Sequence, residues 1–222
     1  ELPHDGKGRV VCNADAALRV LEQHPVFKDA LWFDTFQHRL LTRWNSETER
    51  DWHDEDTQRL LIFMQRDCHL SRISKSAVED ALSVYATRTQ RHIVRDWCQT
   101  LKWDGVQRME RCFSDYFGSP DTPYIQSASK NFWLSLVARI YWPGCQADHM
   151  VVLEGPQGIG KTSALRVIGG SWYLSLHVTV GSLDFYQLLP GKLVVEIAEL
   201  DAFRKQETTR IKQAISTTVD SY

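Results

Sequence analysis

The segment GPQGIGKT, residues 155–162, restricts the fold of this chain more than any other stretch of its sequence. It matches the pattern Gly-x-x-x-x-Gly-Lys-Ser/Thr, in which a glycine-rich loop cradles the phosphates of a nucleotide. The apolar run HMVVLE (149–154) before it is typical of a buried parallel strand, and KTSALRVIG (161–169) after it is typical of a helix. Strand, loop and helix in this order predict a nucleotide-binding α/β domain.

The residue types in this loop suit the binding of phosphate. Glycines allow the backbone to curl so that successive N–H groups point at phosphate oxygens, and the N-terminus of the following helix adds a partial positive charge. We expect Lys161 to stabilise charge on the terminal phosphates and Thr162 to offer its hydroxyl to Mg²⁺. The residues expected to contact the nucleotide are Gly155, Pro156, Gln157, Gly158, Ile159, Gly160, Lys161, Thr162 and Ser163.

A second apolar run, GKLVVEIAELD (191–201), carries acidic residues on or just after a predicted strand. Hydrolysis at a phosphate loop requires such acids to hold Mg²⁺ and to polarise water. Glu199, at the C-terminal end of the strand, is the main candidate for both roles, as a metal ligand together with Thr162. Glu196 points to the opposite face of a regular strand, and a structural ion pair is the alternative to a catalytic role. The catalytic candidates are Lys161, Glu199 and Glu196.

The pattern of apolar residues divides the chain into a mostly α-helical N-terminal domain, 1–118, and a P-loop NTPase domain, 119–222. The boundary is placed at GSPDTP (118–123), the densest cluster of turn-forming residues in the chain. In the N-terminal domain, the aromatic segment 30–44 predicts one or two short strands, and helical spacing predicts four helices. These helices are expected within 13–23, 57–68, 76–89 and 94–101.

Side chains that cap helices precede several of these segments. The expected caps are Asn13, then Asp54 or Asp56, then Ser74 or Ser76. In the second domain, Thr122 followed by Pro123 predicts a helix that runs to about Trp142.

Composition limits the classes of protein to which the chain can belong. The formal net charge of −2 over 222 residues shows no general basic excess, so any contact with nucleic acid must come from a local patch. The five cysteines are odd in number and widely spaced, which argues against a disulfide framework and a zinc site and predicts a reducing, cytoplasmic location. No apolar run approaches the length needed to span a bilayer, so no membrane partner is expected.

Three further groups of residues have both a functional and a structural interpretation. The cluster WHDED (52–56), together with His69, contains metal-ligand types, but its spacing fits no strong metal site and helix capping explains the acids. Three tryptophans either stack on nucleic-acid bases or pack inside the protein: Trp52, Trp97 and Trp103. A local basic run is either a solvated face or a DNA contact, and its members are Arg88, Arg91, His92 and Arg95.

Taken together, these motifs resemble those of the virulence-associated protein E family. That family comprises ATPases encoded by phages and genomic islands, related to superfamily-3 helicases and to poxvirus-type primase-helicases. Four segments carry the resemblance: LKWDGVQRM (101–109), VARIYWPGCQADHMVVLEGPQGIGKT (137–162), LPGKLVVEIAELDAF (189–203) and IKQAISTTVDSY (211–222).

The resemblance implies an ATPase domain of a mobile-element DNA replication helicase, from a phage or prophage. It implies ATP and Mg²⁺ as cofactors, single-stranded DNA as a partner and a homo-oligomeric ring in the full-length protein. The loop residues and both Glu196 and Glu199 carry over to nucleotide binding and hydrolysis. Three residues match the segment that leads into a DNA-contacting hairpin in such helicases: Lys212, Ser216 and Asp220.

Members of this family continue past the position of Tyr222 with a polar sensor and with the arginine that completes a neighbouring subunit's site. The P-loop core is therefore expected to be C-terminally incomplete, truncated before the sensor and arginine-finger region. An alternative function is a nucleotide-binding regulatory or interference module without helicase activity. A small-molecule kinase is disfavoured, because no lid-like cluster of arginines follows the loop.

Overall fold

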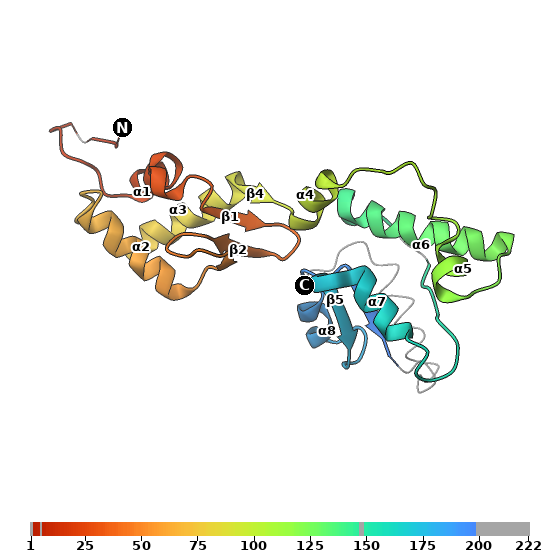
Figure 1. Cartoon of the computed structure of the whole chain (residues 1–222). Helices are drawn as coiled ribbons and strands as arrows, with labels where there is room; N and C mark the ends of the chain where they lie inside the picture. Colours follow the sequence, from red (N-terminus) through yellow and green to blue (C-terminus); the bar gives the residue numbers. More distant parts are fainter. Residues whose placement is uncertain (1, 5, 147–148, 199–222) are drawn as a thin grey trace. The chain divides into compact units, whose positions relative to one another are not determined.

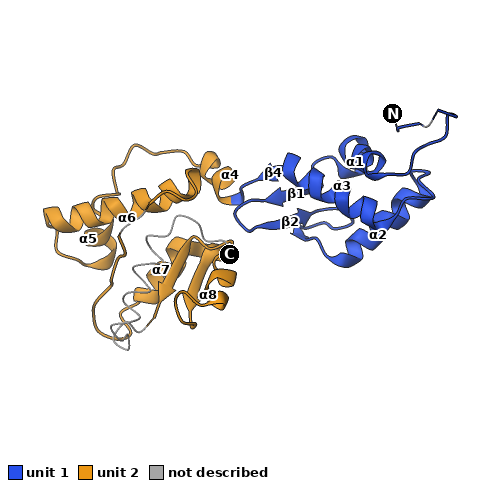
Figure 2. Cartoon of the chain, turned by 180° about the vertical axis from the view of Figure 1, so that it is seen from behind, with its two compact units in different colours: residues 1–93 blue, residues 94–222 orange. Residues whose placement is uncertain are grey.

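The computed structural model describes residues 2–4, 6–146 and 149–198 and divides the chain into two compact units. Unit 1 is Glu1–Ile93 and unit 2 is Val94–Tyr222 (Figure 2). The division therefore lies earlier in the chain than the turn-rich segment 118–123, where the sequence predicts a domain boundary.

Unit 1 combines helices with a small sheet (Figure 1). Its four strands are arranged in the order β3-β2-β1-β4; β1 pairs with β2 in antiparallel and with β4 in parallel orientation. The elements are α1 (Ala14–Gln23), η1 (Pro25–Phe27), β1 (Leu31–Asp34), β2 (Arg39–Thr42), β3 (Arg50–Asp51), α2 (Asp54–Arg66), α3 (Lys75–Arg88) and β4 (Gln90–Arg91). The predicted helices and the predicted strands within 30–44 are confirmed, whereas β3 and β4 are additional.

Helix starts in unit 1 follow local side-chain chemistry. The Asn13 side chain accepts a hydrogen bond from a backbone N–H of the first turn of α1 at 3.0 Å, and Ser74 does the same for α3 at 3.2 Å. The cap of α2 differs from the prediction, because the residue at that position is His53. Asp56 instead accepts the backbone N–H of His53 at 3.0 Å and binds the guanidinium of Arg50 through both carboxylate oxygens, at 2.6 and 2.8 Å.

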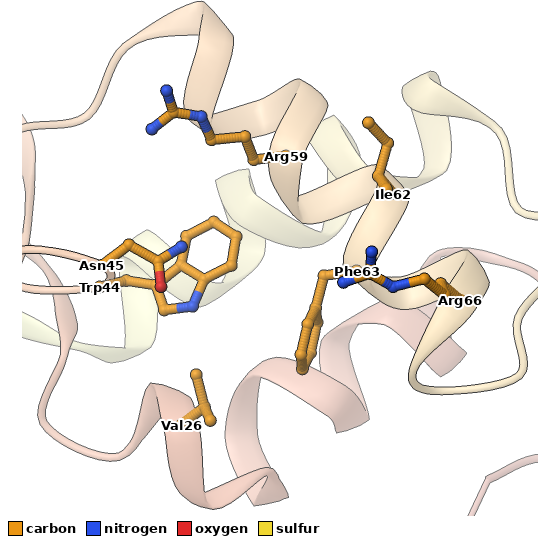
Figure 3. A pocket seen from close by; sticks show the side chains of 7 residues that line it. All are labelled: Val26, Trp44, Asn45, Arg59, Ile62, Phe63 and Arg66. Atoms are coloured by element: carbon orange, nitrogen blue, oxygen red, sulfur yellow. The ribbon is translucent and has the colours of Figure 1, made fainter.

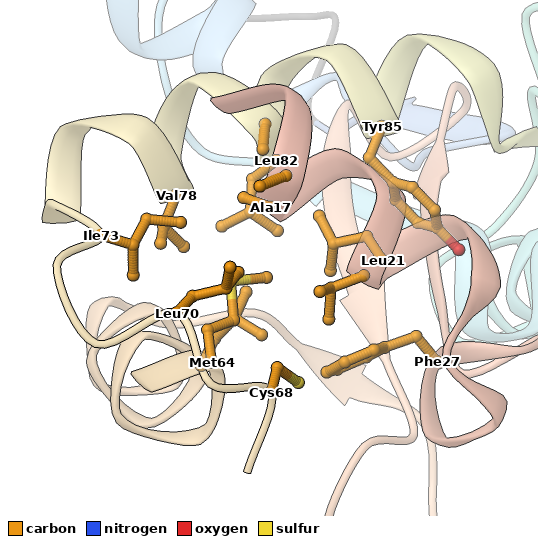
Figure 4. Packing of buried hydrophobic residues seen from close by; sticks show 14 of the residues in the cluster. Ala17, Leu21, Phe27, Met64, Cys68, Leu70, Ile73, Val78, Leu82 and Tyr85 are labelled. Carbon is orange, nitrogen blue, oxygen red and sulfur yellow. The ribbon is translucent and has the colours of Figure 1, made fainter. Parts of the chain in front are cut away.

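The hydrophobic core of unit 1 lies among its three α-helices and the inner strands (Figure 4). Helices α1 and α3 pack against each other, and α2 closes the cluster. Burying one such aliphatic or aromatic side chain contributes about 1.5–3 kcal/mol, so this cluster is the main source of stability of the unit. Its fully buried members include Ala17, Phe27, Leu60, Met64, Leu70 and Val78.

Unit 2 contains helices and a two-stranded parallel sheet. Strand β5 pairs with β6 in the register Tyr173↔Val194 and Ser175↔Glu196, and helix α7 packs against both strands. The elements are α4 (Ile93–Thr100), α5 (Cys112–Phe117), α6 (Pro123–Tyr141), α7 (Lys161–Gly169), η2 (Gly170–Trp172), β5 (Tyr173–Leu176), α8 (Leu183–Leu188) and β6 (Val194–Ile197). Helix α6 begins as predicted, since the Thr122 hydroxyl accepts a backbone N–H in its first turn at 3.3 Å.

The strand predicted before the phosphate loop is not formed: residues 149–154 have no strand conformation. Met150 and Val152 are 41% and 50% exposed, and no described strand pairs with this run. An apolar run becomes a strand only where a neighbouring strand satisfies its backbone N–H and C=O groups. The structure therefore shows a mixed helix-and-sheet fold in which α7 and β6 follow the prediction, without the complete sheet of a P-loop core among the described residues.

None of the helices in the described part of the chain is both long and apolar enough to cross a membrane.

Candidate functional site

The loop that precedes α7 has a backbone that only glycine adopts easily. Gly155, Gly158 and Gly160 have φ angles of 153°, 84° and 92°, values that residues with a side chain rarely take. A Cβ on Gly155 would also lie only 2.7 Å from the Cδ1 atom of Ile159. Gly160 is the residue that precedes the first turn of α7. The glycines of the sequence motif are therefore required by the shape of this loop.

Lys161, the first residue of α7, folds back over the loop. Its Nζ atom donates hydrogen bonds to the carbonyl oxygens of Gly155 at 2.7 Å and of Pro156 at 3.0 Å. The loop itself is exposed and the Lys161 side chain is half-buried. The ammonium group thus lies beside an open loop and is held by neutral acceptors, which charged phosphate oxygens can replace, since hydrogen bonds to an ionised acceptor are stronger.

Thr162 connects the loop to the sheet. Its hydroxyl donates to Oε1 of Glu196, on β6, at 2.7 Å. The second carboxylate oxygen of Glu196 accepts a hydrogen bond from the hydroxyl of Tyr173, on β5. The start of α7 and the two strands of the sheet therefore meet at one carboxylate.

Of the two glutamates predicted to serve hydrolysis, the structure places Glu196 beside the loop. Among the described residues its side-chain contacts are two hydroxyl groups, and no ion pair of the kind considered as the alternative is formed with them. Glu199, the predicted principal acid, lies outside the described residues, as do Lys212, Ser216 and Asp220. The roles of those four residues stay predictions.

Tyr173 is a member of this cluster that the sequence does not indicate. Burial raises the pKa of its phenol, and the adjacent Glu196 carboxylate raises it further, so the hydroxyl stays protonated at neutral pH and donates a hydrogen bond to that carboxylate. The guanidinium of Arg166 lies 5.7 Å from the centre of its ring. The sequence signal that could have located Tyr173 is the short aromatic and apolar run WYLSL (172–176), which comes shortly after Gly169 and Gly170 and is typical of a strand.

Helix α7 is seated on the sheet through Gly169, its last residue. A Cβ at this position would lie 2.7 Å from the Cβ of Tyr173 and 3.1 Å from the Cβ of Val194. Glycine permits this close approach, which brings the other end of the helix, with Thr162, to the carboxylate of Glu196.

The groups at the loop suit Mg²⁺ chemically, although they form only part of a coordination shell. Mg²⁺ prefers oxygen ligands and commonly takes one or two from the protein, with the rest from substrate phosphates and water. A hydroxyl and a carboxylate, from Thr162 and Glu196, are such ligands. Among the described residues no group of three or more His, Cys, Asp and Glu side chains could hold a metal by itself, and this includes the WHDED segment.

The basic run predicted as a solvated face or a DNA contact makes contacts within the protein. Arg88 binds a carboxylate of α1 at 2.5 Å, and Arg91 lies over the ring of Trp32 at 4.6 Å. Arg95 donates to a main-chain carbonyl at the end of α6 at 3.0 Å, and His92 is only 8% exposed. These contacts favour the structural interpretation of the run.

The three tryptophans considered for base stacking have different environments. Trp52 packs parallel to Trp44, with ring centres 5.9 Å apart, and Trp97 meets Trp172 edge to face at 5.6 Å. Trp103 is 76% exposed. Packing inside unit 1 accounts for Trp52, and the exposed ring of Trp103 keeps the stacking hypothesis open for that residue.

A pocket of about 360 Å³ opens on unit 1 (Figure 3). None of the residues that line it belongs to the phosphate loop. Apolar side chains form much of its wall, and two arginines lie at its edge. Both arginines have carboxylate neighbours, Arg59 with Asp56 at 3.8 Å and Arg66 with Asp67 at 3.1 Å. Because these charges are compensated locally, the pocket gives no clear preference for an anionic ligand. Its lining residues are Val26, Trp44, Asn45, Arg59, Ile62, Phe63 and Arg66.

Comparison with known protein families gives one match. The sequence model of the virulence-associated protein E-like domain matches residues 98–222, which is more than half of the chain and contains the loop, α7, β5 and β6. A search of curated proteins found no match. The segment that holds the candidate site is thus the segment that defines the family, and the chain belongs to the virulence-associated protein E-like domain family.

Proposed function

We propose that this chain binds ATP at the loop 155–163 and is the ATPase domain of a DNA replication protein of a mobile genetic element. The observation that supports it most is the hydrogen bond of 2.7 Å between the Thr162 hydroxyl and the Glu196 carboxylate. It places an acid of the second strand beside the residue that follows the loop lysine, which is the arrangement that phosphoryl transfer needs.

Phosphate binding is assigned to the loop and the first turn of α7. The first backbone N–H groups of a helix have no partner within the helix and attract anions. Lys161 adds a full positive charge at the same place, where its Nζ atom lies within 3.0 Å of two loop carbonyl oxygens. On binding, the ammonium exchanges these neutral acceptors for phosphate oxygens.

Thr162 and Glu196 are assigned to Mg²⁺. A bound Mg²⁺ would neutralise charge on the phosphate oxygens. Glu196 orients the Thr162 hydroxyl and adds a carboxylate beside the ion in this proposal, while Glu199 keeps both predicted roles, as a metal ligand and in polarising the attacking water. Association with single-stranded DNA and assembly into a ring are supported by the resemblance of the motifs alone, since the cations of the basic run make contacts within the protein.

The test is ATP turnover by the full-length protein that contains this chain and by its variants, with and without single-stranded DNA. We expect Mg²⁺-dependent turnover that Lys161→Ala abolishes and that Lys102→Ala, a change at an exposed lysine outside the loop, preserves. Stimulation by DNA supports the replication role. Binding of ATP without hydrolysis, with or without DNA, favours the regulatory or interference module instead. Turnover that Lys161→Ala leaves unchanged would overturn the assignment of the site.

A further inference from the structure

The carboxylate of Glu196 receives hydrogen bonds from two different parts of unit 2. Thr162, at the start of α7, donates to Oε1 at 2.7 Å, and the phenol of Tyr173, on β5, donates to Oε2. Each oxygen therefore has its own hydroxyl donor. A carboxylate held at both oxygens cannot rotate about its terminal bond without losing one of the two hydrogen bonds.

The register of the sheet explains how Tyr173 reaches this carboxylate. The direct partner of Glu196 across the strands is Ser175, and Tyr173 lies two residues earlier on β5. Residues two apart on a strand point to the same face, so Tyr173 and Ser175 share a face of the sheet. The long phenol side chain spans the diagonal distance that the serine cannot.

The ring of Tyr173 is itself fixed by α7. Its Cβ atom lies 2.7 Å from the position that a Cβ on Gly169 would take, so helix and strand are in close contact there. The guanidinium of Arg166, one turn earlier on α7, lies 5.7 Å from the ring centre. The hydroxyl is thus placed by packing on the same helix that carries Thr162 at its other end.

We propose that Tyr173 is a positioning residue for the Mg²⁺-dependent part of nucleotide binding, because it holds the Glu196 carboxylate in the orientation that meets Thr162. This inference rests on the proposed nucleotide function of the same site. Tyr173 makes no contact with the carbonyl oxygens that hold Lys161, which belong to Gly155 and Pro156. Loss of the phenol hydroxyl should therefore weaken the Mg²⁺-dependent part of the affinity for ATP and leave the binding of phosphate by the loop unchanged.

The experiment compares the affinity of the full chain for ATP in Mg²⁺ and in EDTA, for the original sequence and for Tyr173→Phe. This change keeps the ring, its packing on α7 and its contact with Arg166, and removes one hydrogen bond to a charged group. We expect the Kd in EDTA to stay unchanged and the Kd in Mg²⁺ to rise about three- to tenfold. Tyr124→Phe, at a tyrosine that is 78% exposed, is the matched control and should change neither Kd.

A second comparison shows whether Tyr173 acts through Glu196. Glu196→Ala, which removes the acceptor of the phenol hydroxyl, and the double variant complete a double-mutant cycle, in which Tyr173→Phe should have little further effect once Glu196 is replaced. Additive effects of the two changes on the Mg²⁺-dependent affinity would mean that the tyrosine supports the fold alone, and would overturn the proposal. An original chain that binds ATP but whose affinity in Mg²⁺ is insensitive to Tyr173→Phe would also overturn it, and would leave the nucleotide function intact.

An original chain that binds no ATP would overturn both the proposed function and this inference. That result differs from ATP binding that is insensitive to Tyr173→Phe, which overturns the inference alone. The melting temperature of each variant is measured first. Tyr173→Phe removes a single oxygen atom, so a Tyr173→Phe chain that does not fold would show that the hydroxyl is required by the fold itself and would also overturn the proposal.

Discussion

Replacement of Gly169 by alanine tests how α7 is seated on the sheet. The backbone of this residue, with φ −80° and ψ −23°, lies in the right-handed helical region, so alanine meets no conformational barrier. In an open helix the exchange would stabilise the protein by about 1 kcal/mol. At this position, however, the new Cβ would lie 2.7 Å from the Cβ of Tyr173 and 3.1 Å from the Cβ of Val194.

The steric cost outweighs the gain in helix propensity. Carbon atoms in good contact lie about 3.5–4.0 Å apart, so α7 must move away from the strands by roughly 1 Å. Both opposing atoms are Cβ atoms, which cannot yield without movement of their own backbone. Overpacking costs about 1–3 kcal/mol, and contact between two Cβ atoms belongs to the upper part of this range, about 2–3 kcal/mol. After the gain of about 1 kcal/mol in helix propensity, we expect a net loss of about 1–2 kcal/mol. The same movement draws Thr162 away from Glu196 and weakens binding of ATP in Mg²⁺.

The assay is thermal unfolding of the full chain, combined with hydrogen exchange of the α7 amides. We expect the unfolding of unit 2 to shift down by about 2–8 °C and exchange in α7 to accelerate. Val167→Ala, on the same helix at a residue that is 83% exposed, is the control and should change stability by less than about 0.5 kcal/mol. If Gly169→Ala proves as stable as the original chain, the close packing of α7 on β5 and β6 is wrong.

Three further predictions concern other residues of the chain. Asp56→Asn should destabilise unit 1 by about 2–3 kcal/mol, because it leaves the half-buried Arg50 without its carboxylate partner, and urea unfolding measures this. The hydrogen-bonded guanidinium of Arg50 holds the pKa of Asp56 below its usual range. The pair therefore stabilises the folded protein fully at pH values above the ordinary Asp pKa of about 3.9, and this stabilisation is lost as the pH falls through the lower pKa of the folded state. An acid-unfolding curve that Asp56→Asn leaves unchanged would contradict this. Gly158 has a φ of 84° and open space around it, so Gly158→Ala should destabilise the protein by about 1–2 kcal/mol through backbone strain and weaken ATP binding. The control Gly6→Ala, also in open space but without a positive φ, should do neither. Equal affinities of Gly158→Ala and the original chain for ATP in a titration would refute this prediction. Burial raises the pKa of the Cys68 and Cys112 thiols and so lowers the fraction present as reactive thiolate. Mass spectrometry after alkylation at pH 8 should therefore find these two modified more slowly than the half-buried Cys12 and Cys145. Equal rates at all four would show that Cys68 and Cys112 are accessible.

Local signals in the sequence predict the elements whose ends are defined by their own residues. Helix α1 begins after Asn13, and α6 begins after Thr122 with Pro123 in its first turn, as capping chemistry requires. The conformation of the glycine-rich loop is predictable for the same reason, since Gly155 and Gly160 allow backbone angles that other residues avoid.

Elements that depend on a distant partner are not predictable in this way. Tyr173–Leu176 is only four residues long and becomes a strand by pairing with β6, whereas the longer apolar run 149–154 has no described partner and forms none. The site shows the same limit. Strand parity predicts opposite faces for Glu196 and Glu199 in a regular strand, but only the packing of α7 decides that Glu196 faces Thr162.

The most direct test of the proposed nucleotide site is calorimetric titration of ATP and Mg²⁺ into the original chain and into Lys161→Ala. Lys161 is expected to supply a charge-assisted contact with the terminal phosphates, and loss of such a contact costs about 1.5–3 kcal/mol. We expect one ATP to bind per chain, with an affinity that Lys161→Ala lowers at least about tenfold. Equal affinities for the two proteins, or no heat of binding for the original chain, would contradict the assignment of residues 155–163 as a nucleotide site.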